Sequence, residues 1–387
     1  QWLEQNRILA SQLPPPRHAR GVEADRVSER QLAFGYTYED LRFLLGPTAL
    51  NGVQPIASMG NDTPLAVLSN KPKHLYQYFK QIFAQVTNPA LDCIREELVT
   101  ATETFIGSEG NLLQPDPCSC RMIRLDNPII DNKRLAQFQE IALDGFKSAT
   151  IDATFPAAEG GSGLDAAMKR IYAEADHAID LGVNILILSD RSIDAANAAI
   201  PTLLAVGGLH QHLVSKGTRT RSSIIVETGE AREVHHFSLL IGYGVDAINP
   251  YMAFDSIHKM IQDSMLDMDF EKAVYNYIKA SIKGVVKTMA KMGISTVDGY
   301  RGAQIFESVG LAEDVIALCL PGTVSVTGGL TLTDIADDLL TVRAAAYDDS
   351  PNLPSPGLIR ERRSGEFHGN NPEIVTELHK TLGVEKA

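Results

Sequence analysis

Short apolar runs alternate with longer helix-like segments from about residue 146 onward, and this alternation constrains the fold more than any other feature. The candidate strands lie at 147–154, 184–189, 223–227, 245–249 and 293–297, with a weaker one at 315–320. Amphipathic segments such as 164–181 and 269–292 separate them. Alternation of this kind predicts a parallel sheet with helical crossovers, and a full barrel has eight such units. We therefore expect an α/β fold with an incomplete or degenerate TIM-like (β/α) barrel.

The segments on either side of these units divide the chain further. Residues 1–35 are polar and are expected to form a connecting arm. Residues 36–145 alternate short helices and strands, which predicts an additional N-terminal α/β portion joined to the later units in one domain over 36–330. The remainder, 331–387, is expected to hold a linker helix, a Pro- and Ser-rich connector and the start of a structure that the chain does not finish.

Two helices are predicted within the N-terminal portion. Tyr38–Leu45 has the composition of a helix. Apolar residues at 75, 76, 79, 82, 83 and 86 are spaced for one helical face. The second helix should end before Asn88-Pro89, because proline disfavours helical backbone in the residue before it.

The charge balance argues against two classes of partner. The chain has 35 basic and 48 acidic side chains and a formal net charge of −13. An excess of negative charge repels phosphate backbones and anionic lipid, so neither nucleic acid nor a membrane surface is expected as a partner. No apolar run reaches the length of about 18 residues that a membrane span needs.

The cysteines favour a reducing compartment. Cys93, Cys118, Cys120 and Cys319 are too few for a disulfide scaffold in a chain of this size. Cys118 and Cys120 form a Cys-x-Cys, but no neighbouring residues complete a set of metal ligands, so no metal site is expected. The chain opens at Gln1 rather than Met, which suggests a fragment or a processed product.

Polar residues follow several of the predicted strands. They are Ser189, Asp190, Arg191, Glu227, Thr228, Asn249, Ser295 and Thr296. In β/α barrels the carboxyl ends of the strands form the active-site face, so this pattern permits an enzyme that uses Asp190 or Glu227 as an acid or base. The alternative is that strands ending at a surface simply end in polar residues.

Three other features carry weaker signals. Glu159-Gly-Gly-Ser-Gly163 lies between a strand and a helix but lacks nucleotide-binding spacing, so a flexible loop is expected. His210, His212, His235 and His236 are expected to be core or surface residues, since neighbours on a helix point about 100° apart. Lys279, Lys283, Lys287 and Lys291 form a basic row that could meet an acidic partner but is more often a solvated face.

Several longer passages resemble a known family. They are Met59-Gly-Asn-Asp62 with Pro64-Leu-Ala-Val-Leu68, Phe79–Pro89 with Ile94-Arg-Glu-Glu97, Ile187–Arg191, His235-His236 with Gly242-Tyr-Gly244, Asp246–Tyr251, Lys291–Thr296 and Tyr300–Glu307. In this order, along most of residues 1–330, they resemble the central domain of glutamate synthase large subunits. The passage Arg362–His368 with Asn371-Pro372 resembles the opening of the flavin-binding synthase domain that follows in that family.

The resemblance implies a multidomain enzyme that makes two glutamates from glutamine, 2-oxoglutarate and reductant. An amidotransferase domain with an N-terminal cysteine releases ammonia, and an FMN domain beside a 3Fe–4S cluster uses it. Electrons come from ferredoxin or from an NAD(P)H-oxidising subunit, in the cytoplasm or the plastid stroma. The central domain resembles a degenerate copy of the flavin barrel, holds the two sites apart and contributes wall to the ammonia tunnel.

The resemblance therefore makes this chain a scaffold. No catalytic, cofactor-binding or metal-binding residues are expected in it, and its candidate interface or tunnel residues are Met59, Gly60, Asn61, Asp62, Glu227, Asn249, Tyr300, Arg301 and Gln304. One alternative is a free-standing β/α-barrel enzyme, possibly flavin-dependent, that uses the polar strand ends. Another is a module that binds glutamine or 2-oxoglutarate through the same polar face.

Overall fold

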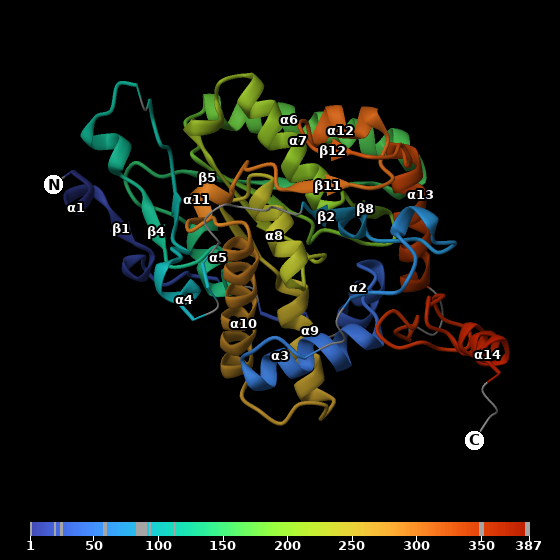
Figure 1. The fold of residues 1–387 in the computed structure, drawn as a ribbon. Helices are drawn as coiled ribbons and strands as arrows, with labels where there is room; N and C mark the ends of the chain where they lie inside the picture. Colours follow the sequence, from blue (N-terminus) through green and yellow to red (C-terminus); the bar gives the residue numbers. More distant parts are fainter. Residues whose placement is uncertain are drawn as a thin grey trace.

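A four-stranded parallel sheet lies at the centre of the computed structural model, which describes residues 2–18, 21–23, 26–56, 60–82, 91–92, 94–111, 113–347 and 352–383 (Figure 1). Its order is β10-β9-β7-β5, with β5 Ser148–Asp152, β7 Ile185–Ser189, β9 Ser223–Glu227 and β10 Ala247–Asn249. Every residue of β7, β9 and β10 is buried. Burial on both faces explains their continuous apolar runs, and it confirms the predicted parallel α/β fold.

Three helices cross between these strands: α6 Gly160–Asp180, α7 Thr202–Ser215 and α8 Val234–Gly242. Two more, α9 Tyr251–Gln262 and α10 Phe270–Lys291, follow β10. Alternate residues of the strands face different layers. Leu186, Leu188 and Val226 belong to the large core with the helices. Ile187 and Ile225 belong to a second core, which the N-terminal portion completes with Ile123 and Phe138 among others.

Two of the predicted strands are wrong. Residues 293–297 form a turn, where only Thr296 makes a bridge, to Ala101, before the short helix α11 Val297–Tyr300. Residues 315–320 lie largely in helix α12 Glu313–Cys319. Short apolar runs do not distinguish a strand from a buried helix. Among the described residues the parallel sheet therefore stops at four strands and does not close into a barrel.

The remaining described strands form smaller sheets. In the first, β1 Ile8–Leu9 and β3 Thr104–Ile106 flank β4 Ile123–Leu125, and α5 Asn132–Gln139 follows. In the second, β2 Phe79–Gln81 and β12 Val324–Ser325 flank β11 Phe306–Ser308. A two-stranded sheet joins β6 Thr154–Pro156 to β8 Asn197–Ala199. A short helix, α4 Glu96–Val99, lies beside α10.

The helix predicted from residue 75 to 86 is wrong in its described part. Leu75–Tyr78 forms a single 3-10 turn and the chain then enters β2. Phe79 and Gln81 pair with β11, more than 200 residues later, and this distant pairing overrides the local helical spacing. Residues 83–90 lie outside the described residues. The helix predicted at Tyr38–Leu45 is present as a π-helical segment, Asp40–Leu45, that runs into α3 Gly46–Asn51.

Both ends of the chain contribute to the packed structure. After α1 Trp2–Asn6, strand β1 pairs with β4, and α2 Val27–Ala33 packs beside α9. At the other end α13 Leu332–Ala344 packs on α6, and α14 Pro372–Thr381 is the last helix (Figure 1). No helix in the described ranges is long and apolar enough to cross a membrane.

The predicted loop Glu159–Gly163 is instead helical: Gly160–Gly163 begin α6, and Glu159 ends the 3-10 turn before it. A Cβ added at Gly161 would lie 2.7 Å from the Cα of Thr333, just inside α13. Gly161 therefore allows the close packing of α6 against α13.

Candidate functional site

Glu227 gathers the polar groups at the carboxyl ends of the central strands. It ends β9 directly beside Ser189 on β7. The hydroxyl of Ser189 donates to Glu227 Oε2 at 2.7 Å, and Arg191 Nε donates to Oε1 at 2.5 Å. The side chains of Arg191 and Glu227 are each only 2% exposed. The predicted polar strand ends therefore do meet, but as a buried ion pair.

Asp190 points into the turn after β9. Both of its carboxylate oxygens accept the backbone N–H of Gly229 at 2.9 Å. Burial raises the pKa of Asp190 to about 7. A carboxyl group with that pKa exchanges a proton near neutral pH, as an acid–base catalyst must. Asp190 is nevertheless only 2% exposed.

Asn249 makes its contacts with the N-terminal portion. Its Nδ2 donates to the carbonyl oxygen of Ile130 at 3.1 Å and to Asn132 Oδ1 at 3.0 Å. Asn249 therefore ties β10 to the start of α5, and its side-chain hydrogen bonds do not involve Glu227.

Helix α2 covers the strand ends. Arg30 Nη2 donates to the carbonyl oxygen of Arg191 at 3.3 Å, and Gln31 Nε2 donates to Ser256 Oγ at 2.9 Å. Just after the helix, the Phe34 ring lies so close to Gly229 that a Cβ there would be 2.1 Å from it. The end of the sheet that holds the active site in β/α enzymes is thus filled by the chain's own N-terminal part.

Several charged side chains beneath this cover have atoms without a hydrogen-bond partner among the described residues. Both oxygens of Asp255 on α9 are buried and make no hydrogen bond with the described residues, and the same is true of Arg30 Nε and Arg191 Nη1. Burial raises the pKa of Asp255 to about 6, although the two arginines lower it. The guanidinium of Arg191 lies 4.0 Å above the ring of Tyr251. These side chains leave the strand ends polar but packed.

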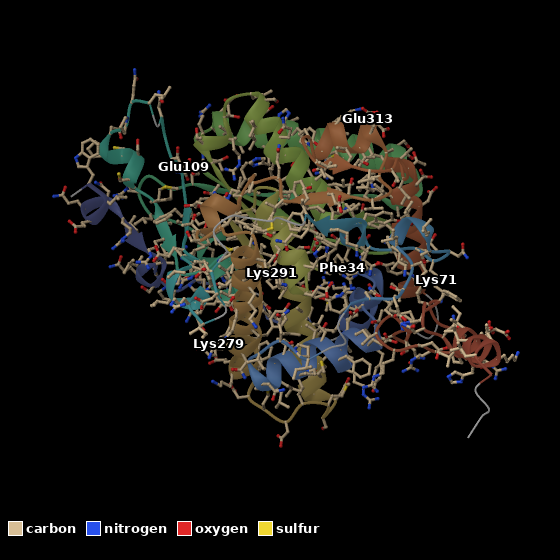
Figure 2. The ribbon with its side chains drawn as sticks, in the orientation of Figure 1. Phe34, Lys71, Glu109, Lys279, Lys291 and Glu313 are labelled. Carbon is tan, nitrogen blue, oxygen red and sulfur yellow. The ribbon has the colours of Figure 1, made fainter. Side chains whose placement is uncertain are left out.

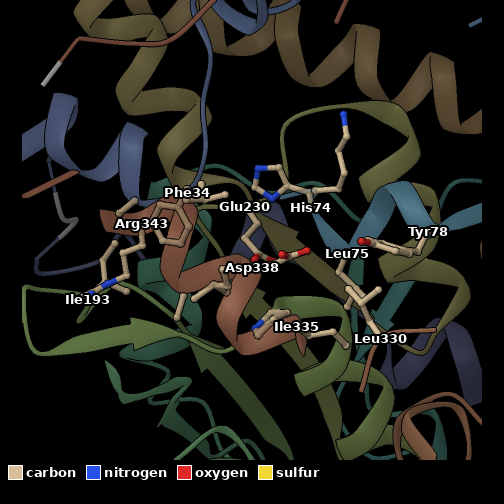
Figure 3. A pocket seen from close by; sticks show the side chains of 16 residues that line it. Phe34, His74, Leu75, Tyr78, Ile193, Glu230, Leu330, Ile335, Asp338 and Arg343 are labelled. Carbon is tan, nitrogen blue, oxygen red and sulfur yellow. The ribbon is translucent and has the colours of Figure 1, made fainter. Parts of the chain in front are cut away.

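A small cavity lies beside this cover, between α13 and the segment around His74 (Figure 3). Its lining includes Phe34, Tyr78, Glu230 and Asp338, and its volume is about 40 Å³. Burial lowers the pKa of His74 to about 3, so this ring is neutral. A cavity of that size holds a few water molecules, whereas ligand pockets measure about 300–1,000 Å³.

The histidines have separate partners. His235 Nε2 contacts the carbonyl oxygen of Tyr76 at 3.0 Å, whereas His236 Nε2 lies 3.0 Å from Glu233. His212 Nε2 lies 3.0 Å from Asp176, and His210 accepts a hydrogen bond from Arg219 at 3.0 Å. The described part of the chain contains no group of three or more His, Cys, Asp or Glu residues placed to hold a metal ion.

Arg301 lies at the opposite end of the sheet. Arg301 Nη1 lies 2.9 Å from one carboxylate oxygen of Asp246, the residue just before β10, and Arg219 Nη2 lies 2.9 Å from the other. Tyr300 is fully buried, and Gln304 is exposed in left-handed backbone with φ of 54°. The predicted interface residues on this loop are therefore not brought together with Glu227 and Asn249.

The loop that contains Asp62 contacts the C-terminal segment. Gly60 and Asn61 are exposed, and Met59 lies outside the described residues. The Asp62 carboxylate accepts the backbone N–H of Asn370 at 3.0 Å and contacts His368. Lys73 pairs with Glu366 close by.

Sequence reasoning missed a second carboxylate that holds this segment. Glu39 is 1% exposed and accepts the backbone N–H of Gly357 at 2.8 Å and of Ile359 at 2.9 Å. Its position inside a predicted helix gave no signal of this role, because its partners lie more than 300 residues later.

The parallel sheet, the helical crossovers and the packed strand ends define an α/β domain. In this domain the chain's own N-terminal part covers the end of the sheet that holds the active site in β/α enzymes. Residues 29–312 match the family model described as glutamate synthase central domain. The chain belongs to this family.

Curated relatives agree with this assignment. The chain is 46% identical to the glutamate synthase [NADPH] large chain of Bacillus subtilis, over 97% of this chain and 24% of the relative. It is 41% identical to ferredoxin-dependent glutamate synthase 2, chloroplastic, of Arabidopsis thaliana, over 93% of this chain and 23% of the relative. The chain thus spans about a quarter of the length of these relatives.

Among solved structures, a flavocytochrome b2 mutant with pyruvate bound matches 70% of this chain and 88% of its own. The identity is 10% and the TM-score 0.34, so this likeness adds nothing to the assignment.

Proposed function

We propose that this chain is the central scaffold domain of a glutamate synthase, which converts glutamine, 2-oxoglutarate and reductant into two glutamates. In this role it links the amidotransferase and FMN domains of the same polypeptide and lines the ammonia tunnel between them. The four-stranded sheet would be the remnant of a β/α barrel. The family match supports the parent enzyme, and the share of the relatives' length supports a domain within a longer chain.

The closed strand ends carry the scaffold proposal. Glu227 is neutralised by Arg191 in a buried pair, and Phe34 packs on Gly229 above them. A catalytic face needs a substrate to reach its acid and base, whereas a scaffold needs a rigid surface. A domain that lines a tunnel needs rigidity for a further reason: ammonia that meets water becomes protonated, so the passage must exclude water.

The cofactors of the parent enzyme, FMN and a 3Fe–4S cluster, are proposed to lie in its other domains. The strand ends of this chain do not fit a flavin, because the rings of Phe34 and Tyr251 and the Arg191 guanidinium pack against one another there. Cys118 and Cys120 share one turn and Cys319 is buried in α12.

The electron donor of the parent is proposed to be ferredoxin or an NAD(P)H-oxidising subunit; the relatives include an NADPH form and ferredoxin-dependent forms.

One observation favours a second candidate, a free-standing enzyme that uses Asp190. Its pKa of about 7 suits acid–base chemistry at neutral pH. A substrate could reach Asp190 only if α2 moved away from the strand ends.

Spectroscopy and turnover separate these two functions. The purified chain is expected to show no flavin absorbance and to form no glutamate from glutamine and 2-oxoglutarate. The full-length polypeptide is expected to show flavin absorbance and to form glutamate. A yellow chromophore bound to the isolated chain, or reduction of an acceptor by it, would refute the scaffold. Tight calorimetric binding of glutamine or 2-oxoglutarate would instead indicate a ligand-binding module.

A further inference from the structure

An irregular strap of chain, residues 354–371, precedes helix α14 and lies against the N-terminal portion. It contains no helix or strand. The backbone N–H of Tyr38 donates to the carbonyl oxygen of Pro354 at 2.8 Å. Lys71, labelled in Figure 2, donates from Nζ to the carbonyl oxygen of Ser364 at 3.4 Å. Because ordering such a segment costs conformational entropy, contacts with the rest of the chain must hold it in place.

Glu39 directs all of its side-chain contacts among the described residues to this strap. Its carboxylate accepts the N–H of Gly357 at 2.8 Å, the N–H of Ile359 at 2.9 Å and the hydroxyl of Ser355 at 3.3 Å. Its ion-pair partner, Arg362, is also on the strap, with Nε 3.6 Å away. A carboxylate that is only 1% exposed is stable only with such donors. The strap supplies them, so a weaker contact at Glu39 acts on the docking of the strap.

Two further carboxylates hold the other end of the strap. Asp62 accepts the backbone N–H of Asn370 at 3.0 Å. Glu366, which belongs to the strap, pairs with Lys73, and these side chains are 5% and 7% exposed. The hydroxyl of Ser69 donates to the same Glu366 oxygen at 3.1 Å. Acidic groups of the domain and of the strap therefore hold the two together from both sides.

The strap continues into α14 through His368 and Asn371. The ring nitrogens of His368 lie 2.6 Å from the carbonyl oxygen of Gly357 and 2.7 Å from Asp62. The carbonyl oxygen of His368 accepts Asn371 Nδ2 at 2.8 Å, and Asn371 Oδ1 accepts two N–H groups of the first turn of α14 at 3.0 Å. No side chain of α14 is buried against the described residues (Figure 1). The strap, rather than packing of the helix, therefore sets the position of α14.

We propose that Glu39 and Asp62 are positioning residues, which fix the strap and, through α14, the start of the domain that follows. The inference rests on the proposed function, in which an FMN domain follows this one and ammonia passes between domains without meeting water. The Bacillus subtilis relative matches 97% of this chain with only 24% of its own length. A loose connection would let the two domains tilt and would open a shared passage to water. The two carboxylates thus help to retain ammonia, although neither touches a substrate.

Hydrogen exchange in the full-length polypeptide measures whether the strap is held as one unit. Glu39→Gln keeps the size of the side chain but replaces one acceptor oxygen by a donor, which opposes the N–H of Gly357 or Ile359. Exchange at these two amides should become about tenfold faster, because a hydrogen bond to a charged group is lost. Exchange at Asn370 should accelerate as well, although its acceptor Asp62 is unchanged. Faster exchange at Gly357 and Ile359 alone would mean that the contacts act independently, and would overturn the proposal.

Ammonia released into solution gives the functional readout. The full-length wild type, supplied with glutamine, 2-oxoglutarate and reductant, should release little free ammonia per glutamine hydrolysed. Glu39→Gln and Asp62→Asn should each raise that ratio severalfold, because loosely held domains let ammonia escape. Leu213→Ala is the control for lost stability, since it leaves a cavity at a fully buried position of α7. It should lower the rates of glutamine hydrolysis and glutamate formation together, without raising the ratio.

Two results of this measurement would contradict the positioning role. The ratio of free ammonia to hydrolysed glutamine could keep its wild-type value in both variants. Both rates could instead fall together, as in Leu213→Ala, which would mean that Glu39 and Asp62 only stabilise the fold. A full-length wild type that forms no glutamate from glutamine and 2-oxoglutarate would refute the proposed function instead, and the exchange rates would still test the strap in that protein.

Discussion

His368 Nδ1 lies 2.7 Å from Asp62 Oδ1, although 306 residues separate them in the chain. The other ring nitrogen, Nε2, lies 2.6 Å from the carbonyl oxygen of Gly357. Both nitrogens therefore face acceptors, and only the doubly protonated ring can donate to both. The Gly357 carbonyl and then Asp62 raise the pKa of His368 above its usual value. The Asn370 N–H and then His368 lower the pKa of Asp62.

This contact should loosen as the pH rises. A histidine whose pKa is raised in the folded state stabilises it below the unfolded pKa of about 6.5 and stops doing so above the raised value. The docking of residues 354–371 should therefore be firmer near pH 6 than near pH 8. Hydrogen-exchange protection factors of these residues, compared at the two pH values, measure this. The variant His368→Asn should show weaker protection of these residues and no change of protection between the two pH values. Equal pH dependence in wild type and variant would mean that His368 is not its cause.

Truncating one member of the Arg191–Glu227 pair should destabilise the fold strongly. Arg191→Met leaves the Glu227 carboxylate buried, with Ser189 and Gln139 as its remaining side-chain hydrogen-bond partners among the described residues. Breaking a buried pair in this way costs about 3–5 kcal/mol of unfolding free energy, measurable by urea denaturation. The double variant Arg191→Met, Glu227→Leu should recover most of that loss, because no charge remains unpaired. If the double variant is as unstable as the single one, packing rather than charge dominates this site.

The sequence predicts the central strands well for a physical reason. Strands at 184–189 and 223–227 are buried on both faces, so they appear as uninterrupted apolar runs that end in polar residues. The same reasoning fails at 315–320, where a short apolar run forms part of a helix. It fails also at Phe79–Gln81, because strand pairing with β11 depends on residues far along the chain.

The closure of the strand ends could not be predicted from local patterns. The sequence predicts that Asp190, Arg191 and Glu227 lie at one edge of the sheet, and they do, because adjacent parallel strands end there. Nothing near them in sequence indicates that Arg30 and Phe34 cover that edge. The residues that hide the site thus come from a segment with the composition of a connecting arm.

The contact of Phe34 with Gly229 makes the closure testable. A Cβ at Gly229 would meet the Phe34 ring at 2.1 Å, so Gly229→Ala should cost about 1–3 kcal/mol through overpacking. Phe34→Ala alone should cost about 3–5 kcal/mol by leaving a cavity. The space left by the smaller side chain at position 34 accommodates the methyl group added at position 229. The double variant should therefore lose clearly less unfolding free energy than the two single variants lose together, as a double-mutant cycle would measure. Gly328→Ala, with open space around it, is the control and should be nearly neutral.

Asp190 should make stability depend on pH between its unfolded and folded pKa values. Burial raises its pKa to about 7, so the folded state holds a proton that the unfolded state has already released, and stability falls as the pH rises from about 4 to about 7. Asp190→Asn removes this effect. Between about pH 4 and pH 7 the unfolding free energy of the variant should rise by on the order of 4 kcal/mol relative to that of the wild type. Urea unfolding at a series of pH values measures the difference, and the exposed Asp267→Asn should show none. A difference between Asp190→Asn and wild type that stays constant with pH would mean that Asp190 is already ionised at pH 4 in the folded protein, and would remove the one observation that favours acid–base catalysis at this face.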